Sequence, residues 1–415
     1  MILRRPRWLG RDLQLLFAGR ALRSVSQSYL AVIVPLYLAH LGYGPVRIGV
    51  FFTVGALGSM SLTATVGFLA DRFGRKALLV ILGVLTAVCG LAFVFTQQFA
   101  ILLVASGLGA IGRGGGAGSG GAFGPYAPAE QALIAEHAGD HYRTTAFSVV
   151  AVVGVIAAAL GSLLATTPTL LHRATGMADV EAERGLFLLT TVLGLAMALV
   201  VLPLRESPRP VRAPGTRHHL AHSTWHVLVR LFVTNAANGL AVGMLGPIMV
   251  YWFHVRYDAT SGQLGTLFFL ANVVAVPTNF AAARVARRLG TVKAIVTARS
   301  TSVTLLAIMA LMPNFLLAAI FFLLRTQANT LSSPMRQSYL MGVVAEDDRS
   351  TAAGLSTLPT QALSTIGPTV AGQLMEMGWL SLPLELAAVL QGVSTLLYYT
   401  FFRNILPPEE QEPPA

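Results

Sequence analysis

Charged side chains are scarce in this sequence. Of its 415 residues only 11% are charged and 54% are hydrophobic, whereas a soluble domain carries about 25% charged residues. That composition is typical of a protein whose solvent is lipid. Cysteine is rarer still, because Cys89 is the only one, which excludes a disulfide or a thiolate metal site within the chain. The sequence shows no metal-ligand set and no cluster of nucleophile, base and orienting residue, so we expect neither an enzyme nor a cofactor.

Long apolar stretches take up most of the chain. Each is long enough to cross a hydrocarbon core of ~30 Å as a helix. We therefore expect an all-α protein of the lipid bilayer. The predicted spans are 13–39, 46–70, 76–96, 100–134, 144–167, 185–204, 226–254, 262–283, 293–312, 314–344, 351–377 and 380–403.

The placement of lysine and arginine predicts the orientation of these spans, because cytoplasmic loops collect basic residues. With a cytoplasmic N-terminus, eighteen basic residues fall on the inner side and four on the outer side, namely Arg47, Arg173, Arg184 and Arg256. We therefore expect both termini in the cytoplasm and the protein in the cell (plasma) membrane. This distribution also explains the net charge of +11 without a nucleic-acid partner.

A polar, proline-rich segment near the middle divides the spans six and six. We expect an N-terminal six-helix bundle at 1–204, a cytoplasmic connector at 205–225, a C-terminal six-helix bundle at 226–403 and a cytoplasmic tail at 404–415. The halves repeat, since residues at an offset of 206 are identical at six positions within a 34-residue window. These are Pro128, Gln131, Arg143, Thr145, Ala146 and Gly161, which recur as Pro334, Gln337, Arg349, Thr351, Ala352 and Gly367. The repeat predicts two pseudo-symmetric bundles, as in many secondary transporters.

The segment Gly67-Phe-Leu-Ala-Asp-Arg-Phe-Gly-Arg-Lys76 lies between the second and third predicted spans. It resembles the loop signature of the major facilitator superfamily, and the twelve spans and central connector extend the resemblance over the whole chain. The resemblance implies the fold of that family and a secondary transporter that works by alternating access. We expect it to act as a monomer on a small-molecule substrate.

The loop signature also contains the first candidate gating residues. The carboxylate of Asp71 can meet helix N-terminal amides and guanidinium groups of the facing bundle in one conformation only. Gly74 permits a tight turn, and Arg75 anchors the loop on the inner side. Asp71, Arg72, Gly74 and Arg75 are therefore predicted to act as a latch.

Ionisable residues within the spans are further candidates, because each costs ~3 kcal/mol near the bilayer centre. In the family that the chain resembles, helices 1, 4, 7 and 10 line the central cavity, and arginines fall on three of these helices. Arginine captures carboxylate or phosphate in a bidentate manner, which predicts an anionic or amphipathic substrate. The predicted substrate-binding residues are Arg23, Arg113 and Arg325, with Gln27, Asn235, Asn238, Gln327 and Asn329 as polar partners; Arg20, on the same helix as Arg23, can instead reach towards the cytoplasm.

Glu130 is the clear acid among the charges of the spans, and the offset of 206 superposes it on Arg336. Pseudo-symmetric positions approach each other when the inner side closes. We therefore predict a gating salt bridge between Glu130 and Arg336 in the outward-facing state. Glu130 is also the candidate proton carrier.

Glycine is concentrated in one place, since ten of the eighteen residues from Gly107 to Gly124 are glycine. No strand precedes this stretch and no Gly-Lys-Ser/Thr follows it, so it is not a nucleotide-binding loop. We expect a closely packed fourth helix instead of a linker. It contains Arg113 but lacks the glutamine that follows such an arginine in proton-coupled exporters of the superfamily.

From these observations we expect a secondary active transporter, coupled to protons, for a small organic solute that is anionic or amphipathic. A multidrug/proton antiporter for lipophilic compounds is the first alternative. A membrane sensor or scaffold that does not transport is the second.

Overall fold

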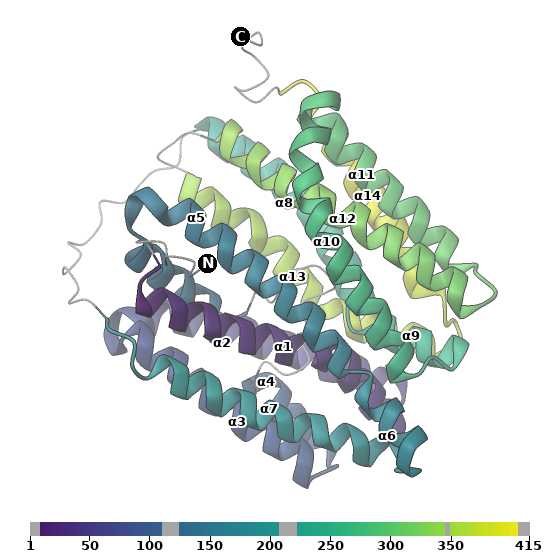
Figure 1. The fold of residues 1–415 in the computed structure, drawn as a ribbon. Coiled ribbons are helices and arrows are strands. Elements are labelled where there is room, and N and C mark those ends of the chain that lie inside the picture. Colours follow the sequence, from purple (N-terminus) through teal and green to yellow (C-terminus); the bar gives the residue numbers. More distant parts are fainter. Residues whose placement is uncertain (1–8, 110–123, 207–221, 345–348, 406–415) are drawn as a thin grey trace, which may run out of the picture. The chain divides into compact units, whose positions relative to one another are not determined.

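The computed structural model describes residues 9–109, 124–206, 222–344 and 349–405, and within these ranges it consists of helices joined by turns, without strands (Figure 1). The helices are α1 (Arg11–His40), α2 (Pro45–Phe73), α3 (Arg75–Phe95), α4 (Phe99–Gly109), α5 (Ala127–Leu164), α6 (Thr167–Thr175), α7 (Asp179–Val201), α8 (His222–Leu245), α9 (Ile248–Tyr257), α10 (Ser261–Leu289), α11 (Thr291–Ala310), α12 (Phe315–Val343), α13 (Arg349–Glu376) and α14 (Leu382–Phe402).

Most of these helices are long and apolar. Among the described residues, nine helices have the length and composition to cross a membrane. The prediction of an all-α, multi-pass membrane protein is confirmed. α1 and α13 fall outside that group although they are 30 and 28 residues long; α1 contains the buried Arg20 and Arg23 and several buried serines. The helices are consistent with the twelve predicted spans.

Two predicted spans are divided in the structure. Residues 100–134 begin as α4, and the described chain resumes before α5; the intervening residues 110–123, which include Arg113, lie outside the described residues. α5 joins two helical parts at Gly139, whose angles φ 65° and ψ 169° are not helical, and this break falls in the gap predicted between 134 and 144. Span 226–254 is divided into α8 and α9 around Pro247, which cannot donate a helical hydrogen bond.

The helices form two compact units. Unit 1 comprises Met1–Pro208 and Phe253–Val273, and unit 2 comprises Arg209–Trp252 and Val274–Ala415. The first half of α10 therefore belongs to unit 1, where Ser261 and the backbone N–H of Gly262 bond to the Thr169 hydroxyl, both at 2.8 Å.

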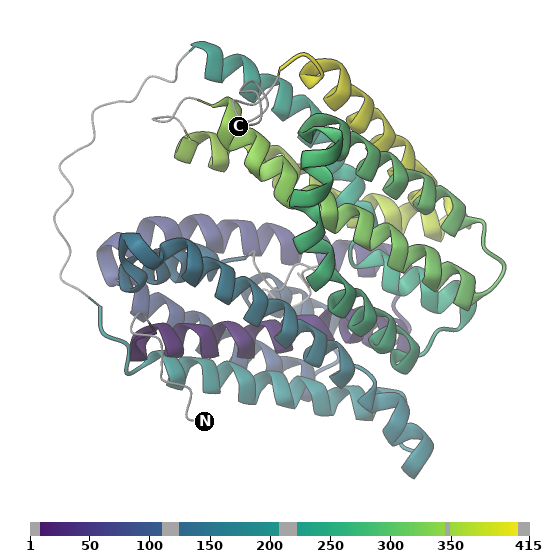
Figure 2. The ribbon, with the colours of Figure 1, turned by 45° about the horizontal axis from the view of Figure 1, so that its top comes forward.

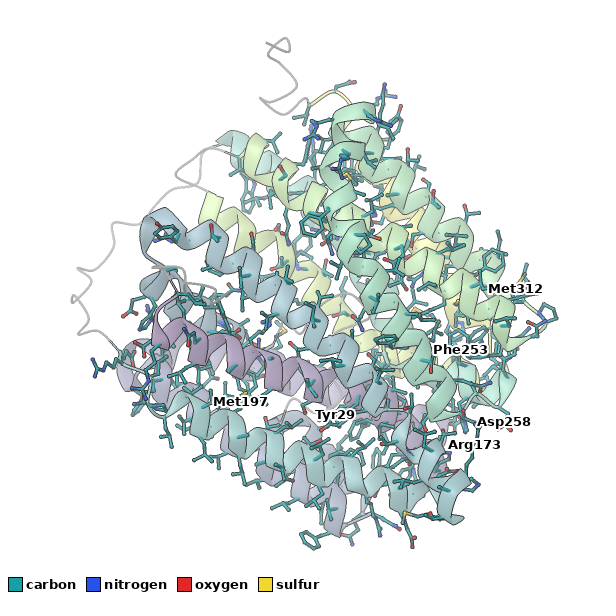
Figure 3. All side chains as sticks on the ribbon, viewed as in Figure 1. Tyr29, Arg173, Met197, Phe253, Asp258 and Met312 are labelled. Carbon is teal, nitrogen blue, oxygen red and sulfur yellow. The ribbon has the colours of Figure 1, made fainter. Side chains whose placement is uncertain are left out.

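Unit 1 is built around α1, which packs against α5 and α7, while α3 also packs against α7 (Figures 1 and 2). Aromatic rings fill its interior. The Phe187 ring lies 4.7 Å from that of Phe93 and 4.9 Å from that of Tyr37, measured between centroids. Tyr29, labelled in Figure 3, joins α1 to α7 through a 2.7 Å hydrogen bond between its hydroxyl and that of Thr190.

Unit 2 is built around α8, which packs against α13 and α14, while α11 packs against α12 and α14. Tyr339, Tyr398 and Phe402 form a buried aromatic group, with the Phe402 ring 4.8 Å from that of Tyr398 and 5.7 Å from that of Tyr339. The apolar faces of α12 and α14 meet here, and the Tyr339 hydroxyl donates to the Ile405 carbonyl at 2.9 Å.

Close helix crossings depend on glycine in both units. A Cβ atom added to Gly161 of α5 would lie 2.3 Å from the carbonyl oxygen of Val25 on α1. In unit 2, a Cβ atom added to Gly367 of α13 would lie 2.4 Å from the carbonyl carbon of Gly243 on α8. Gly161 and Gly367 are paired in the 206-residue repeat, so the repeated glycine occupies the same kind of contact twice.

Candidate functional site

A buried ion cluster lies in the interior of unit 1, where α1 meets α5. We call Arg20, Arg23 and Glu130 the unit 1 ion cluster. The Glu130 carboxylate lies 2.5 Å from Nη2 of Arg23 and 3.5 Å from Nη1 of Arg20. All three residues are buried, at 5–7% exposure. Arg20 and Arg23 are three residues apart, which places them on the same face of α1.

The charges of this cluster do not cancel, because one carboxylate faces two guanidinium groups. The Arg23 guanidinium also stacks over the Tyr126 ring, 4.9 Å from its centroid, which stabilises the cation further. The Tyr126 hydroxyl is held in turn by the Leu82 carbonyl at 2.8 Å and the Thr86 hydroxyl at 2.7 Å. The cluster is therefore fixed from α1, α3 and α5 and keeps a net positive charge.

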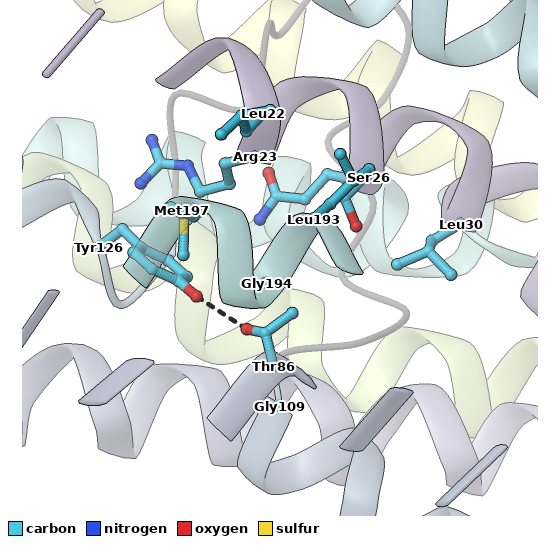
Figure 4. A pocket seen from close by; sticks show the side chains of 11 residues that line it. Leu22, Arg23, Ser26, Leu30, Thr86, Gly109, Tyr126, Leu193, Gly194 and Met197 are labelled. Atoms are coloured by element: carbon cyan, nitrogen blue, oxygen red, sulfur yellow. Dashed lines mark hydrogen bonds between the residues drawn. The ribbon is translucent and has the colours of Figure 1, made fainter. Parts of the chain in front are cut away.

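A small cavity of about 20 Å³ lies beside this cluster, with Arg23, Gln27, Thr86 and Tyr126 in its wall (Figure 4). The rest of the wall is mainly apolar, from Leu22, Leu30, Leu193 and Met197. This volume holds about one water molecule. Two predicted site residues, Arg23 and Gln27, are thus brought together around one small cavity.

A second buried group of polar residues lies in unit 2. We call Arg299, Arg336, Asn238, Ser394 and Tyr398 the unit 2 arginine cluster. Nη2 of Arg299 donates to the Asn238 side-chain oxygen at 3.1 Å and to the Ser394 hydroxyl at 2.8 Å. Arg336 and Tyr398 lie within electrostatic range of Arg299. Arg299 is 5% exposed, and Arg336 is partly buried.

The other predicted substrate-binding residues of unit 2 are dispersed. Arg325 is buried in α12, at 9% exposure. Asn235 donates to the Ser356 carbonyl at 2.7 Å, so its amide joins α8 to α13. Gln327 accepts a 3.0 Å hydrogen bond from the Thr278 hydroxyl, and Asn329 is exposed. Asn238 accepts a hydrogen bond from the side chain of Arg299.

The loop signature between α2 and α3 is held by an acid, Glu206, that no sequence pattern indicated. The Glu206 carboxylate accepts hydrogen bonds from the backbone N–H groups of Arg75 at 2.9 Å and Lys76 at 3.4 Å, so it caps the N-terminus of α3. Gly74 has φ 97°, and the Arg75 guanidinium lies 3.1 Å from the Glu136 carboxylate. The side chains of two predicted latch residues, Asp71 and Arg72 at the end of α2, lie outside the described residues.

Two further buried charges were also missed. Arg299 lies inside the predicted span 293–312, and the rule that singled out Arg325 applies to it equally. Glu183 precedes the predicted span 185–204 but is fully buried, and its carboxylate lies 3.1 Å from Nδ1 of His40. Sequence alone placed Glu183 at a helix end, where most acids are solvated.

Comparison with known proteins agrees with this architecture. The family model described as Major Facilitator Superfamily matches residues 16–231 and 231–415. The uncharacterized membrane protein YJR124C of Saccharomyces cerevisiae is 25% identical over 429 residues, which covers 95% of each chain. The multidrug resistance protein MdtG of Enterobacter lignolyticus is 28% identical over 293 residues, which is 68% of this chain and 64% of MdtG.

Solved structures show the same fold. The crystal structure of a bacterial homologue of the human lysosomal transporter Spinster superposes with a TM-score of 0.72 at 14% identity, covering 97% of this chain and 98% of that chain. Since the family model extends over both halves of the sequence, the resemblance in the loop signature is confirmed. The chain belongs to the Major Facilitator Superfamily, and it is a multi-pass membrane transporter and not an enzyme.

Proposed function

We propose that this chain moves a small organic solute, anionic or amphipathic, by alternating access and with protons as the coupling ion. The observation that carries the proposal is the excess of buried guanidinium groups. A cationic interior of low dielectric attracts anions and repels cations. Within the described residues, the buried arginines are Arg20, Arg23, Arg299 and Arg325, and the buried acids are Glu130 and Glu183.

The unit 1 ion cluster is the proposed place of proton coupling. Glu130 is buried and holds both Arg20 and Arg23. A proton on its carboxylate removes the charge that engages the two guanidinium groups. Arg23, which faces the cavity, then becomes available to an anionic group of the solute. Loss of the proton reverses the exchange, which links solute release to proton release.

Alternating access is proposed to proceed by movement of the bundles 1–204 and 226–403 relative to each other. In this scheme Asp71, Arg72, Gly74 and Arg75 form the latch, and Glu130 exchanges its partners in unit 1 for Arg336 in the outward-facing state. The protein is proposed to act as a monomer in the plasma membrane, without a nucleic-acid partner. Arg113, Arg325, Asn235, Asn238, Gln327 and Asn329 are proposed to complete the solute site.

Transport by the purified protein in proteoliposomes tests this proposal. We expect uptake of at least one organic anion from a panel of carboxylates and phosphate esters, and faster uptake under an imposed pH gradient. Glu130→Gln is expected to abolish the dependence on the gradient, whereas Glu181→Gln, which changes an exposed acid of α7, leaves it intact. Uptake that is indifferent to the gradient in the unmodified protein rules out proton coupling.

A multidrug/proton antiporter is the second candidate, and the similarity to MdtG over 68% of this chain favours it. The same proteoliposomes distinguish the two. Movement of lipophilic cations, with no anion moved, replaces the first proposal by the second. If neither class moves although the protein binds a member of the panel, a sensor or scaffold is supported.

A further inference from the structure

The unit 2 arginine cluster contains buried donors that no described residue satisfies. Nη2 of Arg299 donates to two neutral acceptors, while Nη1 is buried without a hydrogen-bond partner among the described residues. The buried Nε atom of Arg336 also has no such partner in the part of the chain that the structure describes. A buried guanidinium donor left unsatisfied is costly, because its hydration is lost without replacement.

The cluster lies at one depth in unit 2. Arg299 follows the start of α11 by eight residues, and Arg336 and Ser394 precede the ends of α12 and α14 by seven and eight residues. At 1.5 Å per residue, all three are roughly 10–12 Å from these helix ends. The hydrogen bonds from Arg299 to Ser394 and Asn238 show that these three side chains turn towards one another. Three helices, α8, α11 and α14, therefore direct polar groups towards one another, and Arg336 of α12 lies at the same depth as Arg299 and Ser394.

No described acid neutralises this cluster. The acidic residues in the described part of unit 2 are Glu376 and Glu385, and both are exposed, at the end of α13 and in the first turn of α14. Beside the arginines lie Tyr398 and, next to it, Tyr339. Two nearby cations in the interior thus share their environment with hydroxyl and amide groups alone among the described residues, which leaves their charge without a counterpart.

Unit 1 shows what is missing. There Glu130 lies between two arginines and partly cancels their charge. Its counterpart in the 206-residue repeat is Arg336. The position that supplies the counter-charge in unit 1 therefore adds a further cation in unit 2.

We infer that Arg299 and Arg336 form an anion subsite, which takes a carboxylate or phosphate group of the solute in place of the missing acid. Asn238 and Ser394 hold Nη2 of Arg299 and so turn Nη1 towards the anion. Arg336 is the less buried of the two arginines, and the anion enters from its side. The subsite rests on the proposed transport of an anion, but its occupancy is measured without transport.

Tryptophan fluorescence provides the readout, because three of the four tryptophans, Trp225, Trp252 and Trp379, belong to unit 2. The full chain, purified in neutral detergent, is heated in sodium phosphate, citrate or benzoate, with sodium chloride at equal ionic strength as the reference. We expect at least one of these anions to raise the unfolding midpoint in a saturable manner. Arg299→Gln and Arg336→Gln are each expected to weaken anion binding, so that the half-saturating concentration rises at least tenfold.

Arg403→Gln is the matched control, because Arg403 is an exposed arginine of the same unit, just after α14. It should leave the anion response unchanged. Neutralising Glu346, Asp347 and Asp348 together, acids that lie outside the described residues, should also leave it unchanged. If Arg299→Gln does not fold, the two variants of Arg336 test the subsite instead. We expect Arg336→Gln to lose anion binding and Arg336→Lys to retain it.

The subsite is refuted if none of the three anions stabilises the unmodified protein, or if both Arg→Gln variants respond as it does. It is also refuted if neutralising the three acids abolishes the response. Nanodiscs of phosphatidylcholine with and without phosphatidylglycerol identify the source of the anion. If phosphatidylglycerol raises the unfolding midpoint without any added anion, and the Arg→Gln variants lose this effect, the ligand of the subsite is a lipid headgroup. The protein could also bind anions through both arginines and yet transport only cations. That result would refute the proposed substrate class but support the anion subsite.

Discussion

The Nδ1 atom of His40 lies 3.1 Å and 3.2 Å from the two carboxylate oxygens of Glu183, and this pair joins the end of α1 to the first turns of α7. The Glu183 side chain is fully buried, whereas that of His40 is 24% exposed. The His254 ring packs edge-on against that of His40, with centroids 5.3 Å apart. Because an unpaired buried carboxylate is costly, we infer that one proton is shared between His40 and Glu183.

Replacing His40 therefore leaves a buried acid without its partner. We expect His40→Ala to lower the free energy of unfolding of unit 1 by about 2 kcal/mol, and Glu183→Gln by less, because the amide keeps a hydrogen bond to the ring. Thiol labelling during heating measures this, since Cys89 is the only cysteine and is buried in unit 1. The control is His172→Ala, which removes an exposed ring 3.7 Å from Asp179. Equal losses in His40→Ala and His172→Ala would contradict the assignment.

Glu130 offers the sharpest test of the unit 1 ion cluster. Glu130→Gln leaves Arg20 and Arg23 as adjacent buried cations, so we expect the free energy of unfolding to fall by about 3 kcal/mol. Adding Arg20→Gln should recover part of this loss, because it removes one of the two repelling charges. Thiol labelling of Cys89 again provides the measurement, with Glu181→Gln as the control. A double variant that is less stable than Glu130→Gln alone shows that Arg20 contributes packing and not charge.

The sequence predicted where these charged residues lie but not which of them contact one another. Arg20, Arg23 and Glu130 were recognisable as charges within apolar spans. Their contact depends on how α1 and α5 are rotated about their axes. The predicted gating contact between Glu130 and Arg336 in the outward-facing state stays a prediction.

Other parts of the site escaped sequence reasoning for a different reason. Glu206 is the second residue of the predicted connector, and its polar, proline-rich surroundings indicated a solvated segment. In the structure its carboxylate caps α3, and the backbone N–H of Arg205 donates to Asp12 at 3.2 Å. Arg299 lies outside the helices that line the cavity in the family, so the resemblance did not indicate it. Contacts between segments distant in sequence decide both cases.

The repeated glycine gives a prediction about packing. Gly161→Ala places a methyl group against the Val25 backbone, and Gly367→Ala places one against Gly243. Because backbone cannot move aside as a side chain can, we expect each to cost about 1–3 kcal/mol of stability. Thiol labelling reports the first and tryptophan fluorescence the second. Gly185→Ala is the matched control, since an added Cβ there meets nothing within 4 Å, and it should be neutral or slightly stabilising. Equal changes in stability in all three variants would show that the helix crossings at Gly161 and Gly367 are not tightly packed.

The missing counter-charge in unit 2 gives a prediction that does not depend on ligand binding. If Arg299 and Arg336 lack an acid, one of the two cations is repelled by the other when no anion is bound. Arg336→Gln should then raise the unfolding midpoint, or leave it unchanged, in sodium chloride alone. A buried arginine with an ordinary acidic partner would behave in the opposite way, as expected for Arg23→Gln in unit 1. Strong destabilisation by Arg336→Gln would reveal a protein carboxylate at the subsite.

The cap of α3 links the loop signature to the end of α7, and it can be weakened from either side. Glu206→Gln keeps the shape of the cap but loses its negative charge at the helix N-terminus, so we expect a loss of about 0.5–1 kcal/mol. Gly74→Ala is expected to cost more. Its φ of 97° is strained for alanine, by roughly 1–2 kcal/mol, and the added Cβ would lie 3.0 Å from the Glu206 carboxylate. Since Cys89 lies on α3, its labelling rate follows both losses directly. In the double variant the loss of stability should be smaller than the sum of the two single losses, because Gly74 and Glu206 act through one contact. Fully additive losses would show that the turn at Gly74 and the cap by Glu206 act independently.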